Sequence, residues 1–231
     1  MFGKKSKIFR RLNISRYVSR PEGRTLTGYT GGLALKRCFD LLVSVLFLCT
    51  LFPFVFLVVG TAIKCTSPGP VLFRQKRHGK DGRIFTCLKF RSMRVNDTAD
   101  TQPSLANDSR ITPLGRFLRR TFIDELPQFI NVLRGDMSVI GPRPHMLDDT
   151  LRFSHHADDY ACRLAVRPGI TGLAQVLGYL GEVRTPEDLA GRVWYDLYYI
   201  DHWSFSLDIC IFLQTLRNFL FGGSYQKQIF K

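Results

Sequence analysis

The longest apolar segment of the chain, Leu41 to Ile63, contains 23 residues and no charged side chain. A helix needs about 20 predominantly apolar residues to cross the hydrocarbon core of a bilayer, so the segment predicts a helix embedded in a membrane. Pro53 lies near its middle. A proline there removes one backbone hydrogen bond and clashes with the carbonyl one turn earlier, so we expect the helix to bend.

The two flanks of this segment are equally basic. Residues 1–37 contain ten Lys or Arg and one acid, and residues 64–94 contain nine and one. Lys and Arg collect on the cytoplasmic side of a membrane, so a true span is expected to have unequal flanks. Equal flanks favour a re-entrant helical hairpin with both ends on the cytoplasmic side and arms of about 18 Å. Proline-kinked spans are also common, so the residues alone leave both arrangements open.

Beyond the apolar segment the pattern predicts shorter elements. Residues 71–77 and 83–90 are typical of two strands, and the turn between them, at 79–82, contains two glycines. Residues 141–144 (GPRP) are expected to form a stiff, extended loop, because a residue before a proline avoids the helical conformation. The remaining patterns predict, in chain order, helices over 114–122, 127–134 and 146–163, and a glycine-punctuated strand and turn over 166–179.

The last apolar segment, 206–221, has only Asp208 and Arg217 as charged residues among its 16 positions. It is short for a bilayer span. It follows a stretch rich in Trp and Tyr, side chains that favour the membrane–water interface. The pattern therefore predicts a helix that either lies at a membrane surface or packs in the core of the globular part.

The charge is concentrated in the first part of the chain. The net charge of the chain is +14. Residues 1–94 contain nineteen Lys or Arg and three acids, so this part alone has a net charge of +16. Such a segment favours an anionic partner, either nucleic acid or acidic lipid headgroups. Because the basic residues surround the apolar segment and no nucleic-acid recognition motif is present, we expect lipid and no nucleic acid. The alternative functions are a non-catalytic, membrane-tethered basic adaptor and a nucleic-acid-binding protein.

The most informative polar residues are the adjacent acids Asp124 and Glu125, which come shortly before Pro127 and have arginines on both sides. Proline is favoured in the first turn of a helix, so we expect the acids beside the free N–H groups of a helix start. Two carboxylates among arginines suit chemistry on a phosphate ester. One can attack phosphorus, one can hold a divalent cation, and the arginines can neutralise phosphate oxygens. The alternative is an ordinary helix terminus with surface ion pairs.

Five short motifs connect these features. They are KFRSM (89–93), DELPQ (124–128), GPRP (141–144), RPGITG (167–172) and YYIDHWSFSLDI (198–209). By their order and spacing, the chain resembles the bacterial sugar transferases, the monotopic phosphoglycosyl transferase family, over the stretch from Lys36 to Phe221. The HMLDDT and GYLGE segments resemble the subgroup that transfers glucose 1-phosphate. Leu173 and Leu177 depart from the family pattern and leave the identity of the sugar open.

The resemblance implies a fold of the α+β class that is mainly helical. It combines a membrane-embedded re-entrant helical hairpin with a cytoplasmic catalytic domain that has a short β-hairpin and interfacial helices. The implied location is the inner, cytoplasmic membrane of a bacterium, with the catalytic domain on the cytoplasmic face. The expected parts are a basic N-terminal arm (1–35), the re-entrant membrane helix with Pro53 (36–66), the catalytic sugar transferase domain (67–223) and a C-terminal tail (224–231).

The resemblance also implies a reaction. A sugar 1-phosphate is transferred from a UDP-sugar to undecaprenyl phosphate or another polyprenyl phosphate, and UMP is released. The reaction depends on Mg²⁺ and passes through a covalent phosphosugar–aspartate intermediate. It is the initiating step in the assembly of an exopolysaccharide, capsule, O-antigen or glycoprotein glycan. The implied partners are the two substrates and membrane lipids, with a homodimer as a further expectation.

Within this scheme Asp124 and Glu125 are the expected catalytic residues. Asp124 is the expected nucleophile, and Glu125, together with Asp124, is the candidate ligand of Mg²⁺. Arg143 is the first candidate for a phosphate clamp, because its planar fork suits bidentate contact and its stiff loop lowers the ordering cost. The other candidates match cationic, substrate-binding positions of the family: Arg119, Lys89 and Arg91.

Overall fold

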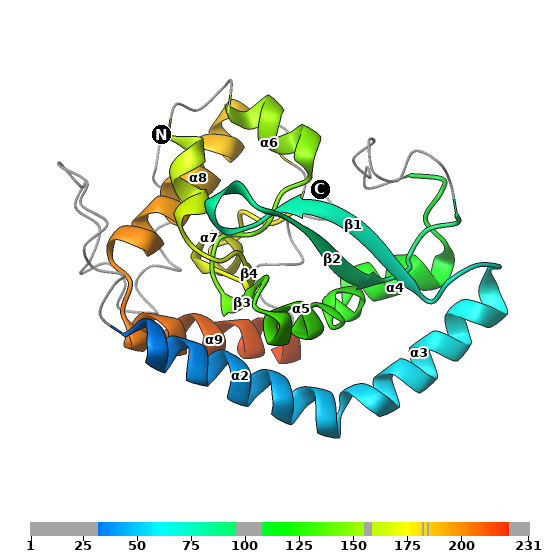
Figure 1. Cartoon of the computed structure of the whole chain (residues 1–231). Helices are drawn as coiled ribbons and strands as arrows, with labels where there is room; N and C mark the ends of the chain where they lie inside the picture. The colour runs from blue at the N-terminus through cyan, green and yellow to red at the C-terminus, as the bar shows by residue number, and fades with distance from the viewer. Residues whose placement is uncertain (1–31, 96–107, 155–158, 182, 184, 222–231) are drawn as a thin grey trace.

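The computed structural model describes residues 32–95, 108–154, 159–181, 183 and 185–221. Its N-terminal part is a pair of long helices, α2 (Leu33–Thr50) and α3 (Phe52–Thr66), which are bent by 58° relative to each other. They lie along one side of the molecule, with α9 (Phe205–Phe221) beside α2 (Figure 1). Almost all of the predicted N-terminal arm (1–35) and the whole of the predicted tail (224–231) lie outside the described residues, so the predicted division into parts stays a prediction.

The bend between α2 and α3 is located at Leu51, and Pro53 lies in the first turn of α3. Helical hydrogen bonds from Leu51 N to Phe47 O and from Val55 N to Leu51 O, both 3.1 Å, flank the proline, which has no N–H to donate. The predicted bend is therefore confirmed. Within the described residues no single helix has the length and apolar character needed to cross a membrane, whereas the bent pair taken together has both.

The globular part begins with the predicted hairpin. Strands β1 (Leu72–His78) and β2 (Ile84–Phe90) pair in antiparallel orientation, joined by the 3₁₀ turn η3 (Lys80–Gly82). Asp81 and Gly82 have φ values of 56° and 71°, and this left-handed backbone lets the chain reverse within a few residues. The hairpin confirms the prediction for this region.

The remaining elements are mostly short. In chain order they are α4 (Pro113–Arg120), η4 (Ile123–Glu125), α5 (Gln128–Arg134), β3 (Ser138–Ile140), α6 (Leu147–Ser154), η5 (Tyr160–Ala165), β4 (Gly169–Thr171), α7 (Leu173–Val176), α8 (Pro186–Asp201) and α9. Helices α4 and α5 confirm the predictions over 114–122 and 127–134. The predicted mainly helical α+β class is also confirmed.

Three details differ from the predictions. The described residues of 146–163 form α6 and the separate 3₁₀ segment η5 instead of one helix, and residues 155–158 lie outside the described residues. The predicted turn after β4 is the short helix α7. Strand β3 is not apparent from the sequence, because a three-residue strand is too short to show alternation of polar and apolar side chains. It pairs with β4 in parallel orientation.

The apolar core consists of two clusters. The larger one surrounds the β3–β4 pair and α8 and includes Ile140 and Tyr199. The smaller one consists of Ile63, Phe90 and Leu118, which join α3 to β2 and α4. The second cluster therefore fixes the end of the bent helical pair against the hairpin.

A buried polar cluster fixes the start of α2 to the globular part. The Lys36 ammonium donates to Asp208 Oδ2 at 2.7 Å, to Ile140 O at 2.9 Å and to the Tyr199 hydroxyl at 3.1 Å. Asp208 also accepts from the Tyr199 hydroxyl at 2.7 Å and from the Trp203 indole at 3.0 Å. A buried ion pair is stable only when its remaining donors and acceptors are satisfied, as they are here. The cluster therefore orients α2 relative to β3, α8 and α9.

Two further contacts extend this attachment along α2. Asp40 accepts hydrogen bonds from the Ser138 hydroxyl and from Val139 N, both at 2.9 Å. Arg37 donates to Val132 O, near the end of α5, at 2.8 Å. These contacts explain why α2 is longer than the arm of about 18 Å that was predicted for the helical hairpin. Its 18 residues correspond to about 27 Å at 1.5 Å per residue, because its first turns belong to the globular part.

The outer faces of α2, α3 and α9 expose large apolar side chains. Examples are Leu42 on α2, Leu57 on α3, and Leu213 and Phe219 on α9. Large exposed apolar patches on a folded protein mark contact with a membrane or another protein. Helix α9 also buries Ile211 in the core. The core packing expected for this segment is therefore confirmed for part of α9, and its position at a membrane surface stays a prediction.

Replacing Lys36 by methionine tests the attachment of α2. The variant leaves Asp208 buried without its cation, so we expect the free energy of unfolding to fall by about 3–5 kcal/mol. The control Arg152→Met breaks the ion pair between Arg152 and Asp149, in which the arginine is exposed. It should cost no more than about 1 kcal/mol. Thermal unfolding of both variants in one detergent measures the difference, and equal losses would contradict the assigned role of Lys36.

Candidate active site

The acidic pair lies on a tight turn between two helices. After α4, Phe122 has a left-handed backbone with a φ of 57°, and the chain reverses there. Asp124 and Glu125 follow on η4, where Glu125 N donates to Phe122 O at 3.1 Å. Pro127 occupies the N-cap of α5. The acids therefore lie directly before α5, beside the start of the helix, as the sequence predicted.

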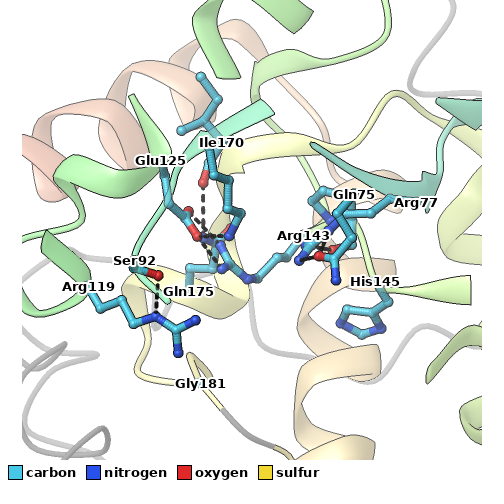
Figure 2. A network of polar contacts seen from close by, with 12 residues as sticks. Gln75, Arg77, Ser92, Arg119, Glu125, Arg143, His145, Ile170, Gln175 and Gly181 are labelled. Carbon is cyan, nitrogen blue, oxygen red and sulfur yellow. Dashed lines mark hydrogen bonds and ion pairs between the residues drawn. The ribbon is translucent and has the colours of Figure 1, made fainter. Parts of the chain in front are cut away.

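Glu125 is the centre of a buried ion-pair cluster (Figure 2). Arg143 contacts both of its oxygens, Nη1 to Oε2 at 2.9 Å and Nη2 to Oε1 at 2.5 Å, and Lys89 donates to Oε1 at 2.6 Å. Burial alone would raise the pKa of Glu125. The charges and hydrogen bonds of Arg143 and Lys89 outweigh it and hold that pKa well below its ordinary value. Glu125 is therefore ionised, and its charge is compensated.

Asp124 is as buried as Glu125, but within the described part of the chain no hydrogen bond or ion pair holds its carboxylate. Burial, together with the neighbouring Glu125 charge, raises the pKa of Asp124 to about 6, against the opposing charges of Lys89 and Arg119. Two carboxylates whose environments separate their pKa values take different chemical roles. Glu125 orients the cations, and Asp124 is available to a ligand.

Arg119 is half-buried on α4 and is held by Ser92. Its Nε donates to Ser92 Oγ at 2.8 Å (Figure 2). Gly115 on the same helix packs directly on the backbone of Ser92, because a Cβ there would lie 1.8 Å from Ser92 O. Burial lowers the pKa of Arg119, and the charge of Asp124 is the main opposing influence. Arg119 and Asp124 therefore share one electrostatic environment.

Lys89 lies near the end of β2, and Asn131 fixes that strand against α5. The Asn131 side chain accepts from Leu88 N at 3.0 Å and donates to Thr86 O at 2.7 Å. It also donates to Asp136 Oδ2 at 3.0 Å. These bonds hold β2 at Thr86 and Leu88, just before Lys89, and so direct the Lys89 side chain to Glu125.

The loop that carries Arg143 is positioned by backbone contact between the GPRP and RPGITG motifs. A Cβ on Gly141 would lie 2.6 Å from Arg167 O, and one on Gly169 would lie 2.1 Å from Gly141 N. A Cβ on Gly172 would lie 2.2 Å from Gly141 O. Only glycine permits such close approach of two backbones. Arg143 therefore projects from a rigid base next to the β3–β4 pair.

Arg91 has a different environment from the other predicted site residues. Its guanidinium donates to Ser67 O at 2.8 Å and to Pro68 O. These carbonyls follow the last turn of α3, where arginine commonly satisfies unpaired acceptors. Burial lowers the pKa of Arg91. The contacts support a structural role, and contact of Arg91 with a substrate stays a prediction.

A second polar network holds the backbone of Arg143 and Pro144, and no sequence pattern predicted it. Arg163 on η5 donates to Asp196 Oδ2 on α8 and, at 2.9 Å, to Arg143 O. Arg77 on β1 donates to Pro144 O at 2.5 Å. No local pattern marks these residues, because Arg163 and Asp196 are 33 positions apart in different elements.

The donor set near the acids suits a divalent cation that arrives with a phosphorylated ligand. Within the described residues, no group of three or more His, Cys, Asp or Glu side chains is arranged as a metal site. Mg²⁺ is usually held by one or two carboxylates together with water and substrate phosphates. Asp124 offers such a carboxylate directly. Glu125 offers a second carboxylate once it gives up its contacts with Arg143 and Lys89.

The chain is similar to several known proteins. A family model described as bacterial sugar transferase matches residues 32–222. The chain is 46% identical over 195 residues to a UDP-glucose:undecaprenyl-phosphate glucose-1-phosphate transferase of Klebsiella pneumoniae, an alignment that covers 84% of this chain and 42% of that protein. It is 42% identical over 190 residues to a UDP-N-acetylgalactosamine-undecaprenyl-phosphate N-acetylgalactosaminephosphotransferase of Aeromonas hydrophila, covering 81% and 44% of the two proteins.

A shorter relative matches over nearly its whole length. The chain is 43% identical over 196 residues to the exopolysaccharide production protein PSS of Rhizobium leguminosarum bv. phaseoli, which covers 83% of this chain and 98% of that protein. By contrast, the chain spans less than half of the Klebsiella and Aeromonas proteins. The range that the family model matches, 32–222, includes Asp124, Glu125 and the GPRP and RPGITG motifs. The chain therefore belongs to the bacterial sugar transferase family, as its motifs predicted.

Proposed function

We propose that this protein transfers a sugar 1-phosphate from a UDP-sugar to a polyprenyl phosphate and releases UMP, with a covalent phosphosugar intermediate on Asp124. The names of the relatives, which describe sugar-phosphate transfer to undecaprenyl phosphate, support the overall reaction. We propose undecaprenyl phosphate as the acceptor and UDP-glucose as the donor. Relatives with 45–47% identity are named for glucose.

The observation that carries this proposal is the unequal pairing of the two acids. Glu125 holds two cations, whereas the buried Asp124 carboxylate has no such partner among the described residues. A carboxylate without competing hydrogen bonds keeps its lone pairs available for attack on phosphorus. Arg143, Arg119 and Lys89 supply positive charge beside it, which an anionic diphosphate needs before it can react.

In the first step, an Asp124 oxygen attacks the β-phosphorus of the UDP-sugar. The bond between that phosphorus and the oxygen bridging the two phosphates breaks, and UMP leaves with the electron pair. A mixed anhydride of the Asp124 carboxyl group and the sugar phosphate stays on the protein. Arg143 and Arg119 stabilise the negative charge on the phosphate oxygens during the attack.

Arg143 must change partners in this step. Both Glu125 oxygens occupy its fork, so an incoming diphosphate competes with Glu125 for the same donors. When the phosphate takes Arg143, Glu125 gains a free oxygen. Asp124 and Glu125 would then hold Mg²⁺ together with the substrate phosphates. When bound, the ion supplies Lewis-acid polarisation of the phosphate.

In the second step, a phosphate oxygen of the polyprenyl phosphate attacks the same phosphorus and the Asp124 carboxylate leaves. The products are the polyprenyl-diphosphate sugar and the free protein. The lipid has to reach the site from a membrane. We propose that α2 and α3 enter the cytoplasmic membrane of a bacterium as a re-entrant pair from the cytoplasmic face, with α9 at its surface. The apolar outer faces of these helices support this arrangement.

The covalent route predicts a burst of UMP without lipid. Incubation with UDP-glucose and Mg²⁺ should release about one UMP per active site, and intact mass should show one sugar phosphate on the protein. Asp124→Asn should abolish both, because an amide is neither charged nor nucleophilic.

Glu125→Gln is the matched control for this experiment, because it changes the adjacent carboxylate in the same way. We expect slower UMP release, weaker Mg²⁺ dependence and an adduct that is detectable after long incubation. If UMP appears only after polyprenyl phosphate is added, and no adduct forms on Asp124, the transfer is direct. Asp124 would then be a metal ligand or a general base.

The raised pKa of Asp124 predicts a pH dependence. Only the ionised carboxylate attacks phosphorus, so the burst rate should rise with pH, reach half of its maximum near pH 6 and level off about one pH unit higher. The folded protein binds this proton more tightly than the unfolded chain, so ionisation destabilises the fold as pH rises through this range. Asp124→Asn, which resembles the protonated form, should have a higher Tm than wild type at about pH 8 and the same Tm below about pH 4. An equal gain in Tm at both pH values would contradict the raised pKa of Asp124.

The membrane arrangement predicts a labelling pattern. In a cysteine-free background, Arg20→Cys and Lys80→Cys place single thiols on either side of the bent pair. Both should react with a membrane-impermeant reagent only when the cytoplasmic side is accessible. Labelling of one of them from outside intact cells would mean that the pair spans the membrane. Pro53→Ala should shift the pair toward spanning, because it restores an N–H group and removes a clash.

A further inference from the structure

We propose that the buried ion pair between Arg163 and Asp196 positions Arg143 for catalysis by fixing its backbone while its guanidinium exchanges Glu125 for the substrate phosphate. This inference rests on the proposed function. It concerns two residues that do not belong to the cluster of Asp124, Glu125 and their cations. It also gives helix α8, which carries Asp196, a part in the reaction.

The contacts of Arg163 are numerous and leave it little freedom. Its Nη2 donates to Arg143 O at 2.9 Å, and its Nε and Nη2 donate to Asp196 Oδ2 at 3.0 and 2.5 Å. Its Nη1 contacts the Tyr160 hydroxyl at 3.2 Å and His145 Nδ1 at 3.1 Å. Both side chains of the ion pair are only 2% exposed. The guanidinium therefore cannot turn without losing several partners at once, none of which water replaces.

His145 helps to hold this geometry as a neutral acceptor. Burial and the charges of Arg163 and Arg192 keep the pKa of His145 well below its ordinary value. Arg163 Nη1 lies 3.1 Å from His145 Nδ1, and Arg192 Nη1 lies 3.3 Å from His145 Nε2. Because an arginine can only donate and a neutral imidazole accepts at one nitrogen, His145 accepts from one of these two arginines. The imidazole therefore adds a hydrogen-bond acceptor to the network without adding positive charge.

A second arginine fixes the next residue of the loop. Arg77 on β1 donates to Pro144 O at 2.5 Å, and Gln75 Oε1 holds its Nε and Nη2 at 3.2 and 2.8 Å. In Figure 2, Arg77 and Gln75 lie on the side of Arg143 away from Glu125. The carbonyl oxygens of two consecutive residues, Arg143 and Pro144, are thus each held by an arginine from a different element.

This arrangement matters because the two ends of Arg143 have different tasks. Glu125 orients the guanidinium in the structure, but that restraint ends when a phosphate takes its place. The contact of Arg163 is made to the Arg143 carbonyl oxygen, so it persists during the exchange. A donor that is held in place before the substrate arrives contributes more to the rate than one that must be ordered during the reaction.

A double-mutant cycle between Arg163→Lys and Arg143→Lys tests the proposal. Each substitution keeps the charge and removes the planar fork. In the wild-type background, Arg163→Lys should slow the UMP burst from UDP-glucose about tenfold and weaken UDP binding. In the Arg143→Lys background it should cost less than about threefold, because the group that it positions is already lost. Arg152→Lys, on α6, is the charge-conserving control and should change neither quantity.

Equal fold losses in the two backgrounds would overturn the proposal, because Arg163 would then act on the fold in general. Thermal unfolding shows whether each variant is folded. If Arg163→Lys is not, Asp196→Asn replaces it in the same cycle with the same expectations. If the wild-type protein releases no UMP either with or without polyprenyl phosphate, the proposed function fails. The cycle is then decided by the Kd for UDP, where additive losses still overturn the positioning role.

Discussion

The buried negative charge of Glu125 determines how the active site is arranged. A charge removed from water is costly unless it is paired, and Glu125 is paired with Lys89 from β2 and Arg143 from the GPRP loop. Compensating this charge therefore brings three separate segments to one point. These contacts engage Lys89 and Arg143, whereas within the described residues no hydrogen bond or ion pair holds the neighbouring Asp124 carboxylate. Burial, together with the Glu125 charge, raises the pKa of Asp124. In the proposed mechanism, the charge of Glu125 therefore influences both the assembly of the site and the choice of Asp124 as the nucleophile.

Close backbone packing gives this electrostatic centre a rigid base. Gly115 lets α4 lie on the backbone of Ser92, and Gly141 and Gly169 let two loops touch through their main chains. Arg119 and Arg143 project from these contacts. Because the backbones are fixed, a change of partner at the guanidinium of Arg143 does not require the loop to move.

Polar contacts also connect the site to the apolar helices. Lys36 and Asp40 are buried against the globular part, while farther along the bent pair the outer face is apolar. Helix α2 therefore packs against the globular part at its start and exposes an apolar outer face farther along. For the proposed reaction, which joins a water-soluble donor to a lipid acceptor, this continuity fixes the orientation of the site relative to the membrane.

Local patterns were enough to predict the bend at Pro53, the hairpin, helices α4 and α5, and the acidic pair among its cations, because prolines, glycines and periodicity act over a few residues. They did not show strand β3, its parallel pairing with β4, or the ion pair between Arg163 and Asp196, whose members are distant in sequence. Nor did they show which acid is compensated. Lys89 and Arg143 lie 36 and 18 positions from Glu125, and both meet it instead of Asp124. Only the packing of β2, η4 and the loop sets those distances, and charge interactions at close range in a buried site then decide the chemistry of each carboxylate.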